Sequence, residues 1–232
     1  MATGIVPSIG LPGIGSSVTA QRTNVSRDGD IRYMPGSFSI EGTKTRDPFN
    51  TASIYSIRAG TLMGKITSGG FYAPTIIGVT SGAYTSGGTS LTVSAASALE
   101  LVRRIGSTGT FNLIGPASAA GSNNTTQVTY SAVNTSTGVI TITDIGANRI
   151  AGCFVCAEDG SQVPVTFIAD QYPLLIPDDS SDVAFPWLPI SCIVNTANIQ
   201  NWPSDTTLQT YIRTSLSSLV GGKFVFSDSF TA

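Results

Sequence analysis

The chain has 232 residues, a formal net charge of −2 and no histidine, and only 11% of its residues are charged. The weak negative charge argues against a nucleic-acid binder, because neutralising phosphates takes clustered Lys and Arg. Without histidine, Ser-His-Asp and Cys-His catalysis and most zinc sites are excluded. The abundance of Ser, Thr and Gly suits a β protein, whether it meets other proteins over wide areas or faces water alone.

Residues 1–50 are interrupted by proline and glycine and predict an extended N-terminal arm. We expect no secretory signal, since the start lacks a basic region followed by an unbroken apolar run, and no membrane span. Large side chains spaced along the arm would pack on a partner or back on the chain's own domain. These candidate anchors are Arg22, Ile31, Tyr33, Phe38, Ile40 and Phe49.

Residues 55–80 predict a β-hairpin. Apolar and polar residues alternate with a period of two through residues 54–58 and again through 62–66, as in half-buried strands. Ser68-Gly69-Gly70 supplies the turn, and residues 75–80, rich in Ile and Val, form the predicted return strand. We expect a protein that begins near Thr51 to keep its fold without the arm.

A Gly- and Ser-rich linker at 81–90 separates this hairpin from a predicted inserted module, residues 89–168. Ser97 and Glu100 have the spacing of a capping box and predict a short helix that stops at Gly106. Five strands should follow, at 110–114, 126–133, 138–143, 150–157 and 163–168. The module is therefore expected to be α+β, with one helix on an antiparallel sheet.

The chain after 168 should return to the first body, so that residues 51–88 and 169–232 form one β-rich unit. Four prolines between 173 and 189 predict a segment at an edge or surface, followed by a buried strand at 190–194. Asp205 is the expected N-cap of a helix at 206–220, and a terminal strand is predicted at 223–226. The predicted fold class is mainly β with minor α.

The strand Arg58-x-Gly60-Thr61-Leu62, the pair Gly64-Lys65 and the return Ile76-Ile77-Gly78-Val79 stand in an order that resembles the lambda-type head decoration proteins of tailed bacteriophages. The resemblance covers residues 53–79 and, after an insertion, 170–195. It implies a β-rich cement protein that stabilises the expanded head, seated as a trimer at the three-fold positions of the shell. It also implies an N-terminal arm that orders on the capsid.

On this resemblance we expect a virion structural protein, made in the bacterial host cytoplasm and bound to the outer capsid surface. Its partners would be the major capsid protein and its own copies, with no nucleic acid or membrane involved. The arm anchors named above would contact the capsid. The module 89–168 departs from the compact family pattern, and we expect it to project outward or to widen the trimer contacts.

Candidates for chemistry are few. Cys153 and Cys156 lie on a predicted strand that points them to opposite faces, which favours buried thiols over a redox pair. Arg103 and Arg104 are expected on a solvated or locally paired helix face. The acidic loop Asp178–Asp182 either binds a calcium ion or is simply solvated.

Trp187 and Trp202 each lie beside a proline, where the ring would either fill the core or anchor an oligomer interface.

No residue is assigned a catalytic, cofactor or metal role, and we expect no enzymatic activity. Two other functions stay open. One is a phage tail, baseplate or fibre component, and the other is a carbohydrate-binding or adhesive β module.

Overall fold

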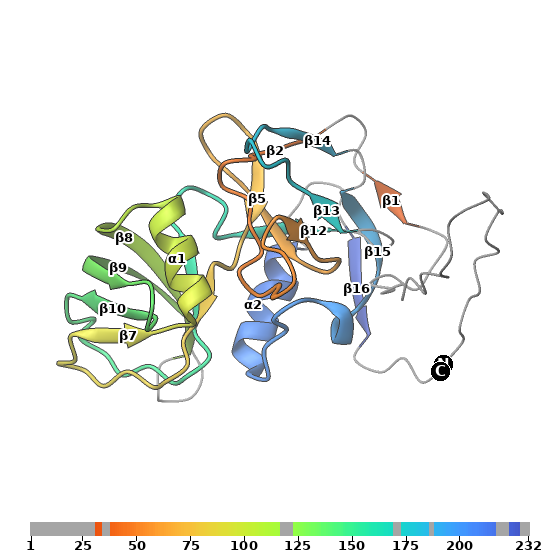
Figure 1. Cartoon of the computed structure of the whole chain (residues 1–232). Helices are drawn as coiled ribbons and strands as arrows, with labels where there is room; N and C mark the ends of the chain where they lie inside the picture. The colour runs from red at the N-terminus through yellow and green to blue at the C-terminus, as the bar shows by residue number, and fades with distance from the viewer. Residues whose placement is uncertain are drawn as a thin grey trace, which may run out of the picture.

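The computed structural model describes residues 31–33, 38–116, 123–168, 173–185, 188–216 and 223–227. Over these residues the protein is mainly β with minor α, built from four sheets and two α-helices (Figure 1). The predicted fold class is confirmed.

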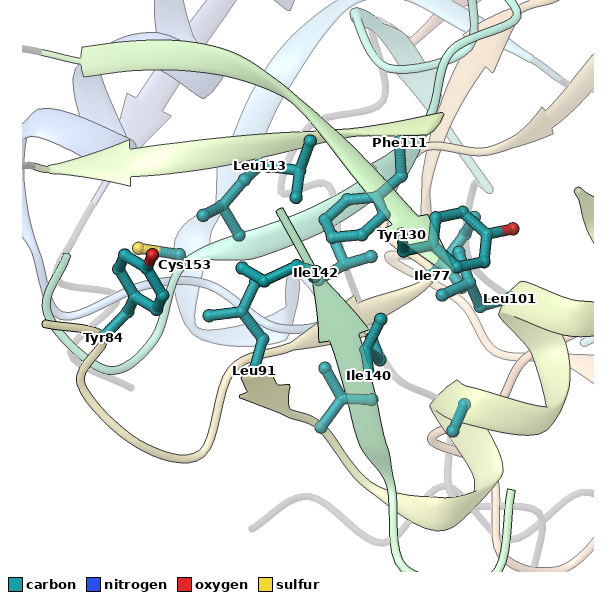
Figure 2. Packing of buried hydrophobic residues seen from close by; sticks show 14 of the residues in the cluster. Ile77, Tyr84, Leu91, Leu101, Phe111, Leu113, Tyr130, Ile140, Ile142 and Cys153 are labelled. Carbon is teal, nitrogen blue, oxygen red and sulfur yellow. The ribbon is translucent and has the colours of Figure 1, made fainter. Parts of the chain in front are cut away.

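The largest sheet has six antiparallel strands in the order β6-β11-β8-β9-β10-β7. Its strands are β6 (Gly78–Val79), β7 (Ser90–Thr92), β8 (Gly109–Pro116), β9 (Asn123–Asn134), β10 (Val139–Ile142) and β11 (Phe154–Ala157). The long β8–β9 pairing runs from Gly109 opposite Tyr130 to Pro116 opposite Asn123. Helix α1 (Ala95–Arg104) packs on one face of this sheet through a core that includes Leu101, Phe111 and Ile140 (Figure 2).

Helix α1 begins three residues before the predicted start. Ser94, not Ser97, is its N-cap, and the Ser94 Oγ accepts a hydrogen bond from the Ser97 amide at 3.0 Å. Glu100 is buried and pairs with Arg103 one turn later, so it makes no capping contact. The predicted stop is confirmed, since Ile105 is the C-cap and Gly106 has a φ of 120°.

A second sheet has five strands in the order β12-β4-β5-β2-β14. They are β2 (Phe38–Ile40), β4 (Leu62–Lys65), β5 (Tyr72–Pro74), β12 (Pro164–Phe167) and β14 (Val183–Phe185). The hairpin prediction is confirmed for β4 and β5, which pair antiparallel around a turn that holds Gly69 at a φ of 88°. The return strand is Tyr72–Pro74, earlier than the predicted 75–80.

The flanks of that hairpin belong to other sheets. Strand β3 (Ser56–Ile57) pairs with β13 (Leu174–Leu175), not with β4, and β6 leaves for the six-stranded sheet. The short β14 lies where the sequence placed an edge, because β14 is the last strand of the five-stranded sheet.

A third sheet contains β1 (Arg32–Tyr33), β15 (Pro189–Asn195) and β16 (Lys223–Ser227), with β15 and β16 parallel. A 3₁₀ turn (Thr196–Asn198) and helix α2 (Thr206–Leu216) connect them. The predicted cap of α2 is confirmed, because Asp205 Oδ1 accepts from the Thr207 and Leu208 amides, each at 2.9 Å.

The predicted module boundaries do not match the sheets. Strand β6 precedes residue 89 yet belongs to the six-stranded sheet, while β12 lies before 168 and pairs with β4 of the five-stranded sheet. The inner strands also have both faces buried: Val155 lies in the core under α1, whereas Phe154 and Cys156 lie in a core with Leu208 of α2. Module and body therefore share hydrophobic core.

The predicted arm is too long at its C-terminal end. Residues 38–50 belong to the body, since β2 pairs with both β14 and β5 and Ile40 is completely buried. A protein that begins at Thr51 would lose this strand and Ile40, so the structure does not favour the expected truncation point. The sequence did not predict this strand, because β2 has only three residues, too few to show a period of two, and its pairing partners lie far along the chain.

Candidate functional site

The predicted anchors of the arm do not gather on one surface. Phe38 is half-buried beside the buried Ile40 in the core of the five-stranded sheet. Ile31 and Phe49 are half-buried against the separate core under α2. Tyr33, half-buried, sits in β1 opposite Pro189 of β15, and Arg22 lies outside the described residues. In the structure, Phe38, Ile40 and Phe49 therefore pack in the hydrophobic cores of the chain itself.

The segment that carries Phe49 is fastened to the hairpin by buried charge. Asp47 has a side chain only 2% exposed and accepts from Arg58 Nε at 2.7 Å and Arg58 Nη2 at 3.1 Å. Its Oδ1 also accepts from the Phe49 amide. Arg46 beside it places its guanidinium 4.3 Å from the centre of the Tyr55 ring. Paired and hydrogen-bonded, these charges hold the segment in place.

A small cavity lies between this segment and the loop before α2. Its volume is about 10 Å³, and its lining includes Asp47, Thr61, Leu62, Gln200 and Asn201. The Thr61 hydroxyl is buried there without a hydrogen-bond partner among the described residues. Such a volume holds about one water molecule, so this cavity has no room for a metabolite.

Trp202 lies at the rim of the core under α2. Its ring stacks on Phe226 of β16 with centroids 6.1 Å apart, and Arg213 of α2 lies 5.4 Å from the Trp202 ring. The ring is half-buried, so it closes the core on one side and leaves part of its surface accessible. Trp187, the other candidate interface anchor, lies outside the described residues.

The three cysteines are free and buried. Cys153 belongs to the core under α1 and Cys156 to the core under α2, so the two thiols point to opposite faces as predicted. Burial raises the pKa of Cys153 to about 11 and that of Cys156 to about 12. Both thiols are therefore protonated and unreactive at neutral pH.

The acidic loop is tied to the body. Asp182 Oδ1 accepts from the Gly42 amide at 2.9 Å, and Ser180 accepts from Arg46. Asp179 accepts from the Ser181 amide, and this bond lowers the pKa of Asp179. In the parts of the chain that the structure describes, no group of three or more Cys, Asp or Glu side chains converges as a metal site.

Arg104 departs most from its predicted role. Its side chain is 1% exposed and donates to the Pro74 carbonyl at 2.6 Å, to Ser161 Oγ at 2.5 Å and to Asp159 at 3.4 Å. It therefore joins α1 of the six-stranded sheet to the hairpin of the five-stranded sheet. Burial acts to raise the pKa of Asp159, but Arg104 and Ser161 together lower it below its usual value.

Each of the three glutamates of the chain has its own hydrogen-bonding partner. Glu41 accepts from Thr43, Glu100 pairs with Arg103, and Glu158 accepts from Thr110 and Gln127. Sequence reasoning assigned no role to the exposed hydroxyl side chains of β9 and β10. The sequence does show that residues 105–143, which include both strands, contain no charged residue.

Comparisons with known proteins identify no relative: no family model matches the chain, and neither a curated protein nor a solved structure does. Within the described residues, no helix is long and apolar enough to cross a membrane.

Proposed function

We propose that this chain is a decoration protein of a tailed-phage head, which binds the outside of the expanded capsid and stabilises it as a trimer at the three-fold positions. The proposal rests on the resemblance of residues 53–79 and 170–195 to the lambda-type decoration proteins. It assigns the chain a binding role, in which many bound copies bridge capsid subunits and resist outward pressure.

The pairing of β3 with β13 carries the proposal. Strand β3 lies in the first segment of the resemblance and β13 in the second, and the long insertion separates them in sequence. Leu174 pairs with Ile57 and Leu175 with Ser56, and the Ile176 amide donates to the Tyr55 carbonyl at 2.9 Å. The two segments thus adjoin, as one body interrupted by an insertion requires.

Two further observations concern the residues of the motif and of the arm. The Gly60 and Gly64 positions of the motif each touch another strand or loop: a Cβ at Gly60 would lie 2.0 Å from the Asn198 carbonyl oxygen, and one at Gly64 2.0 Å from that of Ser161. These glycines therefore serve close packing of the body. The anchors Ile31 and Tyr33 stand where the chain enters the body, next to residues 1–30.

Co-sedimentation tests the proposal. Expanded heads of the phage whose genome encodes the chain are stripped, mixed with the purified protein and pelleted. The expected result is saturable binding at three copies per three-fold position. A protein that stays in the supernatant, or that is found in tails or baseplates of the intact virion, contradicts it. Tight binding of calcium or of a glycan would instead favour the carbohydrate-binding alternative.

A further inference from the structure

The small cavity described above lies at a junction of three parts of the chain. It is lined by residues 46–49, by residues 61–62 at the start of β4 and by residues 200–201 in the loop before α2, with Pro74 and Ile76 completing the wall. Every lining residue belongs to the described part of the chain. The volume of about 10 Å³ equals the least that one water molecule needs.

Thr61 supplies a hydroxyl that needs a hydrogen bond there. Its Oγ1 is buried and has no partner among the described residues. The backbone of the same residue is fully bonded, because the Thr61 amide donates to the Arg58 carbonyl at 3.2 Å and the Thr61 carbonyl accepts from the Ile168 amide at 3.0 Å. A buried hydroxyl without a hydrogen bond costs free energy, so the site favours a small polar ligand.

Gln200 supplies a second polar group of the lining. Its Nε2 donates to the Ala59 carbonyl at 2.9 Å, so the amide oxygen remains as an acceptor. Asp47 also belongs to the lining, but its oxygens already accept from Arg58 and from the Phe49 amide. An acceptor and a hydroxyl without uncompensated charge suit a neutral molecule that both donates and accepts. A metal ion is disfavoured, because Ca²⁺ and Mg²⁺ require about six oxygen ligands.

We propose that one water molecule is a permanent part of this cavity. It hydrogen-bonds to the Thr61 hydroxyl and donates to the Gln200 amide oxygen, beside the backbone bond from the Gln200 amide to the Gly60 carbonyl at 3.0 Å. The water thus adds a second link between the hairpin and the loop before α2. Arg58 and Gly60 already make close contacts at this junction, so all three motif residues hold one joint together. This hydration site does not depend on the proposed function.

Thr61→Val tests the proposal, because valine has nearly the shape of threonine but no hydroxyl. With the water in place, the substitution removes one of its hydrogen bonds and should lower the melting temperature by about 2–4 °C. In a dry cavity the same substitution removes an unsatisfied buried hydroxyl and should raise the melting temperature instead. Thr141→Val is the matched control, since Thr141 is exposed and its melting temperature should stay within about 1 °C of the wild type.

High-resolution crystal structures of the full chain, of Thr61→Val and of Thr61→Ser show the ligand directly. We expect one water within about 2.6–3.2 Å of Thr61 Oγ1 and of Gln200 Oε1 in the wild type, retained in Thr61→Ser and lost from Thr61→Val. An empty cavity in the wild type overturns the proposal, and so does a Thr61→Val protein that melts at or above the wild-type temperature. It is also overturned if dialysis against EDTA removes the density, because the density then belongs to a metal ion.

Discussion

Arg58 Nε donates to Asp47 Oδ2 at 2.7 Å, and this ion pair fastens the segment before the first hairpin to the hairpin itself. A second bond, from Arg58 Nη2 to Asp47 Oδ1, makes the pair bidentate. Asp47 is buried and Arg58 is partly accessible, so the pair lies at the boundary between the core and the surface of the body. Residues 38–50 are thus part of the fold, and a capsid-binding arm would have to lie ahead of them.

Removal of the buried carboxylate should weaken the fold. Asp47→Ala leaves Arg58 and the Phe49 amide without their acceptor, and the free energy of unfolding should fall by about 3 kcal/mol. Asp178→Ala is the control, since this exposed aspartate should change stability by less than about 0.5 kcal/mol. Urea unfolding measures both; equal stability of the two variants would show that the ion pair does not hold the segment.

The motif glycine Gly60 should tolerate no side chain. Its φ is 82°, and an added Cβ would meet the Asn198 carbonyl oxygen. Gly60→Ala should therefore lower the free energy of unfolding by at least about 2 kcal/mol. Gly82→Ala is the matched control, because a Cβ there has no neighbour within 4 Å. A Gly60→Ala protein as stable as Gly82→Ala would refute the close approach.

Arg104 should contribute far more stability than its neighbour in sequence. Arg104→Met removes the hydrogen bonds to Pro74 and Ser161 and leaves Asp159 without its cation, at an expected cost of about 3 kcal/mol in chemical denaturation. Arg103→Met leaves the Glu100 side chain, which is 5% exposed, without its cation, but Arg103 itself is 27% exposed and water can replace it, so the cost should be about 1 kcal/mol. The opposite order would contradict the bridging role of Arg104.

Asp144 should make the fold sensitive to acid. Hydrogen bonds from Tyr84, Gly146 and Gly87 lower the pKa of Asp144 to about 2, against 3.8 for a free aspartate. Since the folded-state pKa is the lower one, this contribution is complete above pH 3.8 and is lost as the pH falls toward 2. Asp144→Asn should therefore lose less stability than the wild type when the pH falls from about 5 to about 2.5. An identical pH dependence of thermal unfolding would show that these bonds do not favour the ionised carboxylate.

Local patterns in the sequence predicted local structure well. The Asp205 cap, the Gly106 stop and the β9–β10 hairpin each depend on a few adjacent residues, and all three are present. The errors concern partners that are distant in sequence. Strand β2 is too short to show a period, and its place in the sheet is set by β14 and β5.

The buried charges were beyond sequence reasoning for the same reason. Arg104 stands beside Arg103 on one helix, but its environment comes from Pro74 and Ser161 on other elements. The absence of charge from residues 105–143 was visible in the sequence, whereas the neighbours of each strand became visible only with the strand register. The capsid-contact and oligomer roles remain predictions.

Cryo-electron microscopy of expanded heads, decorated with the full chain or with a protein that lacks residues 1–30, tests the central proposal most directly. The truncation leaves every described element in place and should keep the thermal stability of the whole chain. We expect density for the full chain outside the shell at the three-fold positions, and bare heads with the truncated protein. Heads left bare by the full chain, or density only on the tail, would contradict the decoration role, and undiminished binding of the truncated protein would contradict the arm.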